Sequence, residues 1–368
     1  MSACEGCLRR TWLLERLAGH LERQRAVIES LLEREDGELI ELLGGRGRAE
    51  LLARHLRYGP EEAELAREEA RRAGLVLICR HDLRYPSRLT ELGTLAPALL
   101  AVNGDHARLD RLAAGAAVAV VGTRRPTGYG LEAAHRLGAD LAGAGVAVIS
   151  GLAYGIDSAA HTGAIAAGGL TAAVLAAAAQ RPSPAGKAPL FGSILATGLV
   201  LSEFGPAGFG RRWTFQARNR IVAGLADATV IVEATTRSGA LITARVSDRI
   251  GRVTAALPGP VGTPQSAGPN EILAKFQAAG QSLNPDRVRA VRGAQDVLDL
   301  LYGEGIVEVH RPRTTPLTPD EARLLEAIRD GRDAVAALAP AQLATLSALE
   351  LKGAVRRGPG GTLQPAVR

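Results

Sequence analysis

Val118-Ala-Val-Val-Gly-Thr-Arg-Arg-Pro-Thr-Gly-Tyr-Gly130 is the stretch that decides the fold class. Its apolar start predicts a short buried strand, which leads directly into a loop that holds glycine, arginine and threonine. A helical pattern over residues 131–141 follows at once. A strand, a glycine loop and a helix start together present backbone N–H groups and a helix dipole to a phosphate.

Each residue type in this loop suits a phosphate site. Gly122 lets a ligand approach the backbone, Thr123 and Thr127 offer hydroxyl donors, and Arg124 and Arg125 supply charge. The order of residues matches neither the P-loop nor the dinucleotide-binding glycine motif. An ordinary strand-to-helix turn with solvated arginines is the alternative that this segment alone leaves open.

The chain alternates strand-like and helix-like segments from residue 116 onward. This alternation predicts a doubly wound, Rossmann-like α/β fold with a mostly parallel sheet. The expected strands are the apolar runs 117–121, 146–149, 171–175, 199–202, 228–232 and 253–257. The expected domains are a small helical domain with a connector (1–104), the Rossmann-like domain (105–300), a linker (301–318) and a winged-helix-like module (319–368) with two helices and a Gly-Gly hairpin.

Charge is unevenly distributed along the 368 residues. The net charge is +6, and its excess lies in residues 105–300, with 19 basic and 13 acidic side chains. A basic domain is typical of proteins that bind polyanions. The alternative explanation of this basic charge is scattered surface charge on a stable domain.

The cysteines and the hydropathy pattern exclude several classes of protein. Cys4 and Cys7 form a lone C-x-x-C without a second pair at zinc-finger spacing, and Cys79 lies in an apolar run. We therefore expect incidental thiols, a buried small side chain and no metal site. The sequence has no signal-peptide pattern and no apolar run of membrane-spanning length, so we expect a cytoplasmic protein without membrane contact.

Polar, glycine-rich segments follow several predicted strands. They are 150–161, 202–205, 215–224 and 233–243. Ligands of open α/β sheets bind at the carboxyl ends of the strands, so these segments are expected to meet the loop at Gly122. The basic and polar residues expected near it are Arg218, Asn219, Arg237, Ser238 and Gly239.

The acidic residues and histidine of these segments do not form a convincing catalytic site. Asp157, His161, Glu203 and Glu233 include no nucleophile with a base at suitable spacing. Asp157 suits the first turn of a helix, and His161 four residues later is placed to bond to it. We therefore expect no enzyme activity and no cofactor.

Together, the motifs resemble those of the bacterial DNA-processing protein A (DprA/Smf) family. They are Gly122-Thr-Arg-x-x-Thr-x-Tyr-Gly130, Ser150-Gly-Leu-Ala-x-Gly-Ile-Asp-x-Ala-Ala-His161, Leu201-Ser-Glu-Phe204, Arg218-Asn-Arg-Ile-Val-Ala-Gly-Leu225 and Val232-Glu-Ala…Arg237-Ser-Gly-Ala-Leu-Ile-Thr-Ala244. The resemblance implies a non-catalytic single-stranded DNA-binding protein of natural transformation and recombination. Such a protein protects incoming strands and loads the RecA recombinase onto them.

The residues and the resemblance together predict a set of DNA contacts. They are Gly122, Thr123, Arg124, Arg125, Thr127, Tyr129, Ser150, Gly151, Arg218, Asn219, Arg220, Arg237, Ser238 and Gly239. Arg124 and Arg218 are expected to be the principal phosphate contacts. Base stacking is open to Tyr129, Phe204, Trp213 and Phe215, with core packing as the alternative for each. Because aromatic residues are few, phosphate contacts should dominate the affinity and make it salt-sensitive.

Three residues depart from the family pattern. Thr123 stands where serine is commoner, Tyr154 where arginine is frequent, and Ala217 where a basic residue is frequent.

Two other functions and a dimer also have to be considered. A nucleotide phosphoribohydrolase on the same fold is the enzymatic alternative, but the sequence lacks its Pro-Gly-Gly-x-Gly-Thr-x-x-Glu motif. A regulator of duplex DNA acting through the last module is disfavoured, because 340–351 contains no lysine or arginine. A homodimer through 253–276 is expected, unless Ile272, Leu273 and Phe276 pack onto their own sheet.

Overall fold

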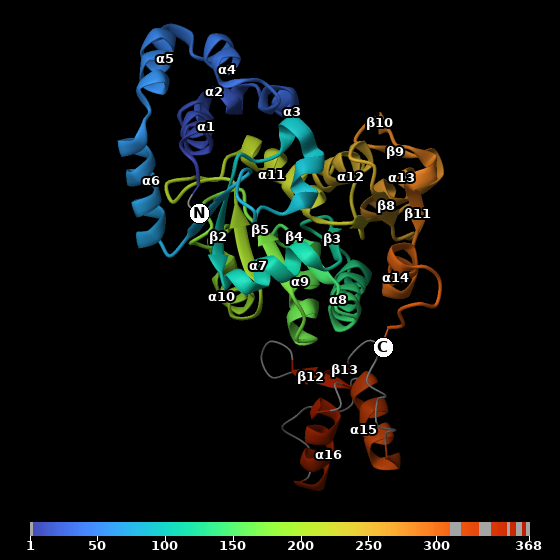
Figure 1. The fold of residues 1–368 in the computed structure, drawn as a ribbon. Helices are drawn as coiled ribbons and strands as arrows, with labels where there is room; N and C mark the ends of the chain where they lie inside the picture. Colours follow the sequence, from blue (N-terminus) through green and yellow to red (C-terminus); the bar gives the residue numbers. More distant parts are fainter. Residues whose placement is uncertain (1–2, 310–317, 331–339, 352–353, 358–362, 366–368) are drawn as a thin grey trace. The chain divides into compact units, whose positions relative to one another are not determined.

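The computed structural model describes residues 3–309, 318–330, 340–351, 354–357 and 363–365 (Figure 1). The chain forms two compact units, residues 1–310 and residues 311–368. Among the described residues, no helix is both long and apolar enough to cross a lipid bilayer.

The first unit is built on a nine-stranded sheet in the order β1-β2-β6-β5-β4-β3-β7-β8-β11. Its strands from β6 to β11 along this order are parallel, whereas β1 and β2 are antiparallel to their neighbours. The strands are β1 Val76–Cys79, β2 Leu99–Gly104, β3 Ala117–Val121, β4 Ala147–Ser150, β5 Thr171–Val174, β6 Leu199–Ser202, β7 Ala228–Ile231, β8 Val253–Ala256 and β11 Val288–Ala290; a separate hairpin pairs β9 Gln277–Ala278 with β10 Gln281–Ser282. The predicted doubly wound α/β fold is confirmed.

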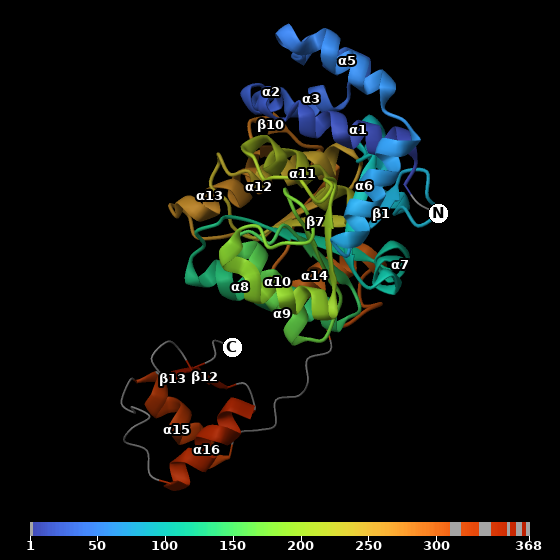
Figure 2. The same cartoon turned by 90° about the vertical axis from the view of Figure 1, so that its left-hand side faces the viewer.

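Helices cover both faces of the sheet. In Figures 1 and 2, α8 and α9 lie on one face and α11 and α12 on the other. Two glycines let α8 and α9 pack closely, because a Cβ on Gly138 would collide with the Ala160 carbonyl and one on Gly163 with the His135 carbonyl. The helices of this unit are α1 Glu5–Arg16, α2 Ala18–Arg23, α3 Ile28–Leu32, α4 Asp36–Leu43, α5 Arg48–Arg57, α6 Pro60–Arg72, α7 His106–Ala114, α8 Gly128–Gly143, α9 Ile156–Ala166, α10 Ala188–Thr197, α11 Arg212–Leu225, α12 Ala240–Arg249, α13 Ala267–Lys275 and α14 Ala294–Tyr302.

The N-terminal helices belong to the same unit as the sheet. β1 and β2 are strands of the main sheet, so the predicted boundary between residues 104 and 105 is corrected. Glu22 accepts a hydrogen bond from the backbone N–H of Trp213 in the first turn of α11 (3.1 Å), and Glu29 pairs with Arg245 on α12 (2.6 Å). These carboxylates fix α2 and α3 to the helices that cover the sheet.

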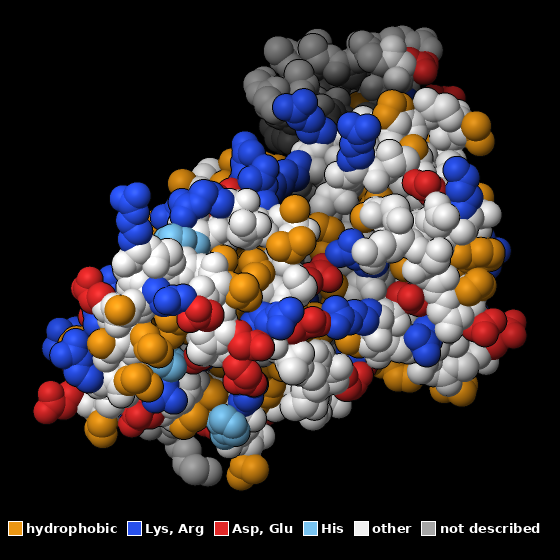
Figure 3. Space-filling view, turned by 90° about the horizontal axis from the view of Figure 1, so that it is seen from above, with side chains coloured by type: hydrophobic (Ala, Val, Ile, Leu, Met, Phe, Trp, Pro, Cys, Tyr) orange, Lys and Arg blue, Asp and Glu red, His pale blue; other side chains and the backbone are white. Residues whose placement is uncertain are grey.

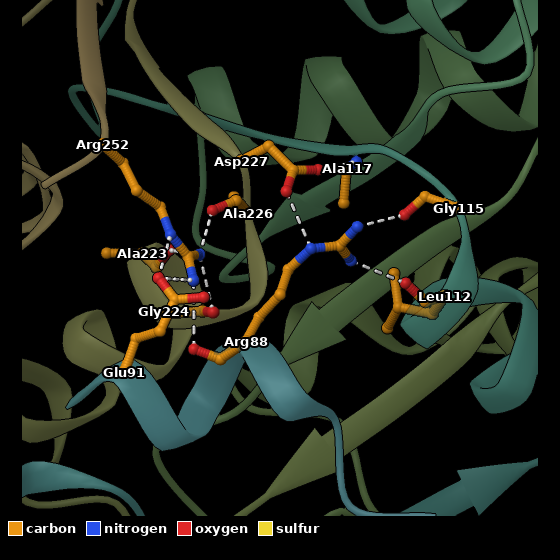
Figure 4. Close-up of polar contacts among 10 residues, drawn as sticks. All are labelled: Arg88, Glu91, Leu112, Gly115, Ala117, Ala223, Gly224, Ala226, Asp227 and Arg252. Carbon is orange, nitrogen blue, oxygen red and sulfur yellow. Dashed lines mark hydrogen bonds and ion pairs between the residues drawn. The ribbon is translucent and has the colours of Figure 1, made fainter. Parts of the chain in front are cut away.

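Two arginines fix the segment that joins β1 to β2 (Figure 4). Arg88 lies in its short helical stretch Ser87–Leu95 and donates to Asp227 (2.8 Å) and to the Leu112 carbonyl (2.9 Å). Arg252 donates to the Gly224 carbonyl (2.8 Å) at the end of α11 and to the Arg88 carbonyl (3.0 Å). A cation at the end of α11 is favoured by the helix dipole, so Arg252 stabilises α11 while holding this segment in place.

The second unit has its own small core. It contains α15 Pro319–Arg329, α16 Pro340–Leu351 and the antiparallel strands β12 Val355–Arg357 and β13 Leu363–Pro365. The core is formed by Leu324, Leu325, Ile328, Leu346, Leu349, Ala354 and Val355. Both predicted helices are present, whereas the Gly-Gly turn and the residues predicted as linker from 310 to 317 lie outside the described residues.

Candidate nucleic-acid interface

A pocket of about 210 Å³ opens at the carboxyl ends of β3 and β4. The chain winds from β3 toward β6 on one side and from β7 toward β11 on the other, so this is the switch point at which α/β sheets bind ligands. Segments far apart in sequence line the pocket: Val121, Gly122 and Arg124; Gly151, Ala153 and Asp157; Phe215, Gln216, Arg218, Asn219 and Val222; and Ser238, Gly239, Ala240 and Thr243.

Arg218 is the buried cation of this pocket. The residue is only 6% exposed, and its Nη1 donates a hydrogen bond to the Val174 carbonyl (2.7 Å). A Cβ on Gly151 would collide with the guanidinium, so any side chain there would displace Arg218 from this position. The Nε–H of Arg218 has no protein partner among the described residues, which leaves a charged donor for a ligand oxygen.

Asp157 provides the opposite charge for Arg218. Its carboxylate accepts hydrogen bonds from the backbone N–H groups of Gly151 (3.1 Å) and Ala153 (3.4 Å). Burial raises the pKa of Asp157, and the Arg218 charge and these donors oppose that rise. Asp157 is therefore a structural partner that holds the loop after β4 around the arginine.

Arg124 is an exposed cation at the same pocket. Its guanidinium carbon lies 5.2 Å from the centre of the Phe215 ring, within the range of a cation–π interaction. Phe215 thus restrains Arg124 at the pocket that Arg218 also lines.

The start of α12 completes the polar lining. Ser238 Oγ accepts a hydrogen bond from the Ala240 N–H (3.3 Å), and the Asn219 side chain donates to the Gly239 carbonyl (3.0 Å). The helix begins at Ala240, where the positive end of its dipole favours an anion. Two arginines and a helix start therefore converge on one pocket.

A protein carboxylate occupies the start of α8, where the sequence predicted a phosphate. Glu233 is 1% exposed and accepts hydrogen bonds from the Thr127 N–H (2.9 Å) and the Thr127 hydroxyl (2.6 Å), while its carbonyl accepts from the Thr123 N–H (2.6 Å). Thr127 is therefore the cap of α8, and its predicted role as a phosphate donor is corrected. Of these two helix starts, it is that of α12 that lines the pocket.

Comparison with known proteins identifies the family. The family model of DNA recombination-mediator protein A matches residues 76–289, which is more than half of the chain. The chain belongs to this family.

Relatives and solved structures agree with this assignment. The chain is 44% identical over 167 residues to a putative DNA processing protein DprA of Mycobacterium tuberculosis H37Rv, and the match covers 45% of this chain and 43% of that protein. It is 33% identical over 250 residues to DprA of Streptococcus pneumoniae R6, and that match covers 67% of this chain and 85% of the relative. It thus spans less than half of the Mycobacterium protein. The S. pneumoniae DprA crystal structure has a TM-score of 0.60 at 27% identity (84% of this chain, 100% of that chain), and Helicobacter pylori DprA, whose structure concerns single-stranded DNA binding, has 0.52 at 26% (62% and 97%).

Two residues of the family motifs are buried and bonded to other groups of the protein. The Ser150 hydroxyl is fully buried and donates to the Val120 carbonyl (2.7 Å). Arg220 pairs with Glu203 at 2.6 and 3.1 Å, and both side chains are 4% exposed. The predictions that Ser150 and Arg220 contact DNA are therefore corrected: both stabilise the core.

The aromatic predictions divide in the same way. Trp213 is fully buried and packs edge-on against Phe204, with ring centres 5.6 Å apart and planes at 89°. For these two residues core packing is the correct alternative. Phe215 lines the pocket, whereas Tyr129 is half exposed and donates its hydroxyl to the Pro258 carbonyl (3.2 Å).

Arg125, Arg237 and Tyr129 are exposed but do not line the pocket. They stay predictions, as contacts for a strand that extends beyond it. Figure 3 shows a face on which basic and acidic side chains are mixed over most of the surface.

His161 does not bond to Asp157 as the spacing suggested. Its Nδ1 lies 2.7 Å from the hydroxyl of Thr171, which itself donates to the Val148 carbonyl (2.8 Å), so Nδ1 carries the proton. Burial and the nearby Arg218 charge lower the pKa of His161 to about 3. His161 is therefore a neutral core residue.

Sequence reasoning missed two features near the glycine loops. Gln216 lines the pocket, and the ammonium of Lys187 lies 4.4 Å from the centre of the half-exposed Tyr154 ring. Tyr154 belongs to the loop after β4, but Lys187 lies 33 positions later in the chain, and no local pattern joins them.

The cysteines also differ from expectation. Cys4 and Cys7 do have a second pair of possible metal ligands, Cys79 and His81, and one ligand atom from each of the four lies within 4.8 Å of the others. The structure therefore brings together four possible ligands that the spacing of Cys4 and Cys7 alone did not indicate. The signal in the sequence is the C-x-H of Cys79 and His81 at the end of β1.

Proposed function

We propose that this pocket binds the backbone of single-stranded DNA, with Arg124 and Arg218 as the principal phosphate contacts. The observation that carries the proposal is the convergence of a buried arginine with an unpartnered Nε, an arginine held over Phe215 and the start of α12 on one pocket. Membership of a DNA recombination-mediator family supports it. Asn219, Ser238 and Gly239 complete the contact surface, and the backbone of Gly122 and Gly151 lines the same pocket.

A single strand suits this site better than a duplex. Arg218 is recessed, so a phosphate must enter the pocket to reach it, and a flexible strand can bend to do so. Phe215 is the aromatic side chain in the lining that offers a ring face to a base. Binding should weaken steeply with salt, because phosphate neutralisation releases counterions.

The test is fluorescence anisotropy of a labelled oligonucleotide with Arg124→Ala, at two salt concentrations. We expect a loss of about 1–3 kcal/mol, or roughly 5- to 150-fold in Kd, since a charge-assisted contact disappears. Arg46→Ala is the matched control, because Arg46 is exposed and outside the pocket. Equal affinities of the two variants would refute the site.

For Arg218, a substitution that keeps the positive charge is a better test than alanine. Removing its charge leaves Asp157 buried without its opposite charge and threatens the fold. Arg218→Lys keeps the charge but loses the planar donor set, so it should weaken DNA binding while preserving folding. Thermal unfolding of the same samples separates the two effects.

We further infer a non-catalytic, cytoplasmic protein that protects incoming strands and loads RecA onto them. RecA filament assembly on a coated oligonucleotide, with and without the protein, tests the loading. Release of free base from nucleoside monophosphates would favour the alternative phosphoribohydrolase.

A homodimer would give two linked DNA sites and raise affinity through effective concentration. Of the predicted dimer face, Ile272 is fully buried and Leu273 packs against the core, whereas Phe276 is 36% exposed. Phe276 is thus the member of that set best placed to meet a second copy. Light scattering with and without oligonucleotide tests the dimer, and a monomer under both conditions would refute it.

A further inference from the structure

Three thiols and one imidazole meet where α1 approaches the end of β1. Two of them lie at the start of α1, one as its N-cap and one in its first turn. The third thiol ends β1, and the histidine follows two residues later. We call these residues the cysteine–histidine cluster: Cys4, Cys7, Cys79 and His81.

The spacing of the ligand atoms fits a tetrahedral metal ion. Zinc–sulfur bonds of about 2.3 Å and zinc–nitrogen bonds of about 2.0–2.1 Å at tetrahedral angles place sulfur and nitrogen about 3.6 Å apart and two sulfurs about 3.8 Å apart. The His81 Nδ1 lies 3.3 Å from Cys4 Sγ and 3.5 Å from Cys7 Sγ. All four ligand atoms lie within 4.8 Å of one another, so small side-chain shifts complete the tetrahedron.

We propose that the cysteine–histidine cluster binds one zinc ion. Thiolate and imidazole ligands in a tetrahedral arrangement select zinc over the hard cations calcium and magnesium, which prefer oxygen. Four protein ligands leave no open position for water or substrate, which is typical of a structural rather than a catalytic site. The C-x-x-C at the start of α1 has the ligand spacing of known zinc sites.

The surroundings of the cluster are already organised for this role. The Cys4 N–H points to Cys79 Sγ at 3.4 Å, a contact that supports a zinc-bound thiolate. Arg67 donates from Nε (3.1 Å) and Nη2 (2.9 Å) to the Ala3 carbonyl and so fixes the segment that carries Cys4. Cys7 and Cys79 are buried, while His81 is exposed and provides a route of entry for the ion.

Zinc would join two distant parts of the chain. Cys4 and Cys79 are separated by 75 positions, so the ion would tie the N-terminal helices to the edge strand of the sheet. Because the ligands meet only in the folded chain, the free energy of zinc binding adds to the free energy of unfolding. The cluster does not line the DNA pocket, so its role is stability of the N-terminal part.

The experiment measures zinc in the full chain. The protein is produced in zinc-supplemented medium with a histidine-free tag at the C-terminus, purified under reducing conditions, and analysed by mass spectrometry of the metal. We expect one zinc per chain, release by a mercurial reagent, and a lower Tm after chelation. Cobalt substitution should give the absorption bands of a tetrahedral thiolate site.

Matched variants decide the assignment. Cys7→Ser and His81→Ala should lose the zinc, His81→Cys should keep it because thiolate replaces imidazole, and His106→Ala, an exposed histidine outside the cluster, should bind it normally. Two outcomes overturn the proposal: wild-type protein that takes up no zinc on titration with zinc chloride, or equal zinc content in Cys7→Ser and the His106 control. Circular dichroism confirms that each variant is folded.

Discussion

Replacing Gly239 with aspartate should weaken DNA binding without weakening the fold. Gly239 caps α12 and lines the pocket, and its φ of −61° suits any residue. A Cβ added there meets nothing within 4 Å, so aspartate and asparagine both fit. Replacing a glycine at an ordinary φ stabilises a protein by about 0.4–1 kcal/mol, because the unfolded chain loses freedom.

The two substitutions differ only in charge. A carboxylate about 5 Å from a bound phosphate, at an effective dielectric constant of about 20, is repelled by roughly 3 kcal/mol. Salt screening reduces this to about 1–2 kcal/mol, which corresponds to about a tenfold rise in Kd. The carboxylate also offsets the charges of Arg124 and Arg218, which acts in the same direction.

The assay compares Gly239→Asp with Gly239→Asn by fluorescence anisotropy of a labelled single strand at two salt concentrations. The aspartate variant should bind about tenfold more weakly than the asparagine variant, and the difference should shrink at high salt. Thermal unfolding should show both variants at least as stable as wild type. Equal Kd values for the two would refute the placement of phosphate at the start of α12.

Three further predictions concern stability and organisation. Arg220→Ala should cost about 3–5 kcal/mol in urea unfolding, since Glu203 is left buried and unpaired; a loss below about 1 kcal/mol would contradict the core role of this pair. Burial raises the pKa of Glu15 to about 7, although the hydrogen bond from the Gly205 N–H opposes this rise. The contribution of Glu15 to the free energy of unfolding is therefore fully present below pH 4.5 and is lost as the pH rises through 7. Glu15→Gln should flatten the fall in Tm between pH 5 and 8, and an unchanged pH profile would exclude Glu15 as its source. A chain ending at residue 309 should keep single-strand binding, because the pocket lies entirely in the first unit; lost binding would assign DNA contacts to the second.

Local sequence patterns were sufficient to predict most elements of the fold and the edge of the sheet that carries the pocket. Apolar runs of strand length and helical periodicity are local properties, so the strands from β3 to β8 lie within one or two residues of their predicted positions. The carboxyl ends of parallel strands meet at one edge, which is why Arg124, Arg218 and Gly239 could be placed together in advance. Short strands such as β11 and the joining of β1 and β2 to the main sheet gave no comparable local pattern.

Which of the predicted residues face the pocket depends on packing between distant parts of the chain. Two positions along a helix differ by about 200° in direction, so Arg218 lines the pocket while Arg220 enters the core beside Glu203. Glu233 occupies the start of α8 although it lies 106 positions from Thr127. Cys4 and His81 lie 77 positions apart in the chain and are brought together in the same way. Such neighbours are set by long-range packing, and the local periodicity of the sequence does not predict them.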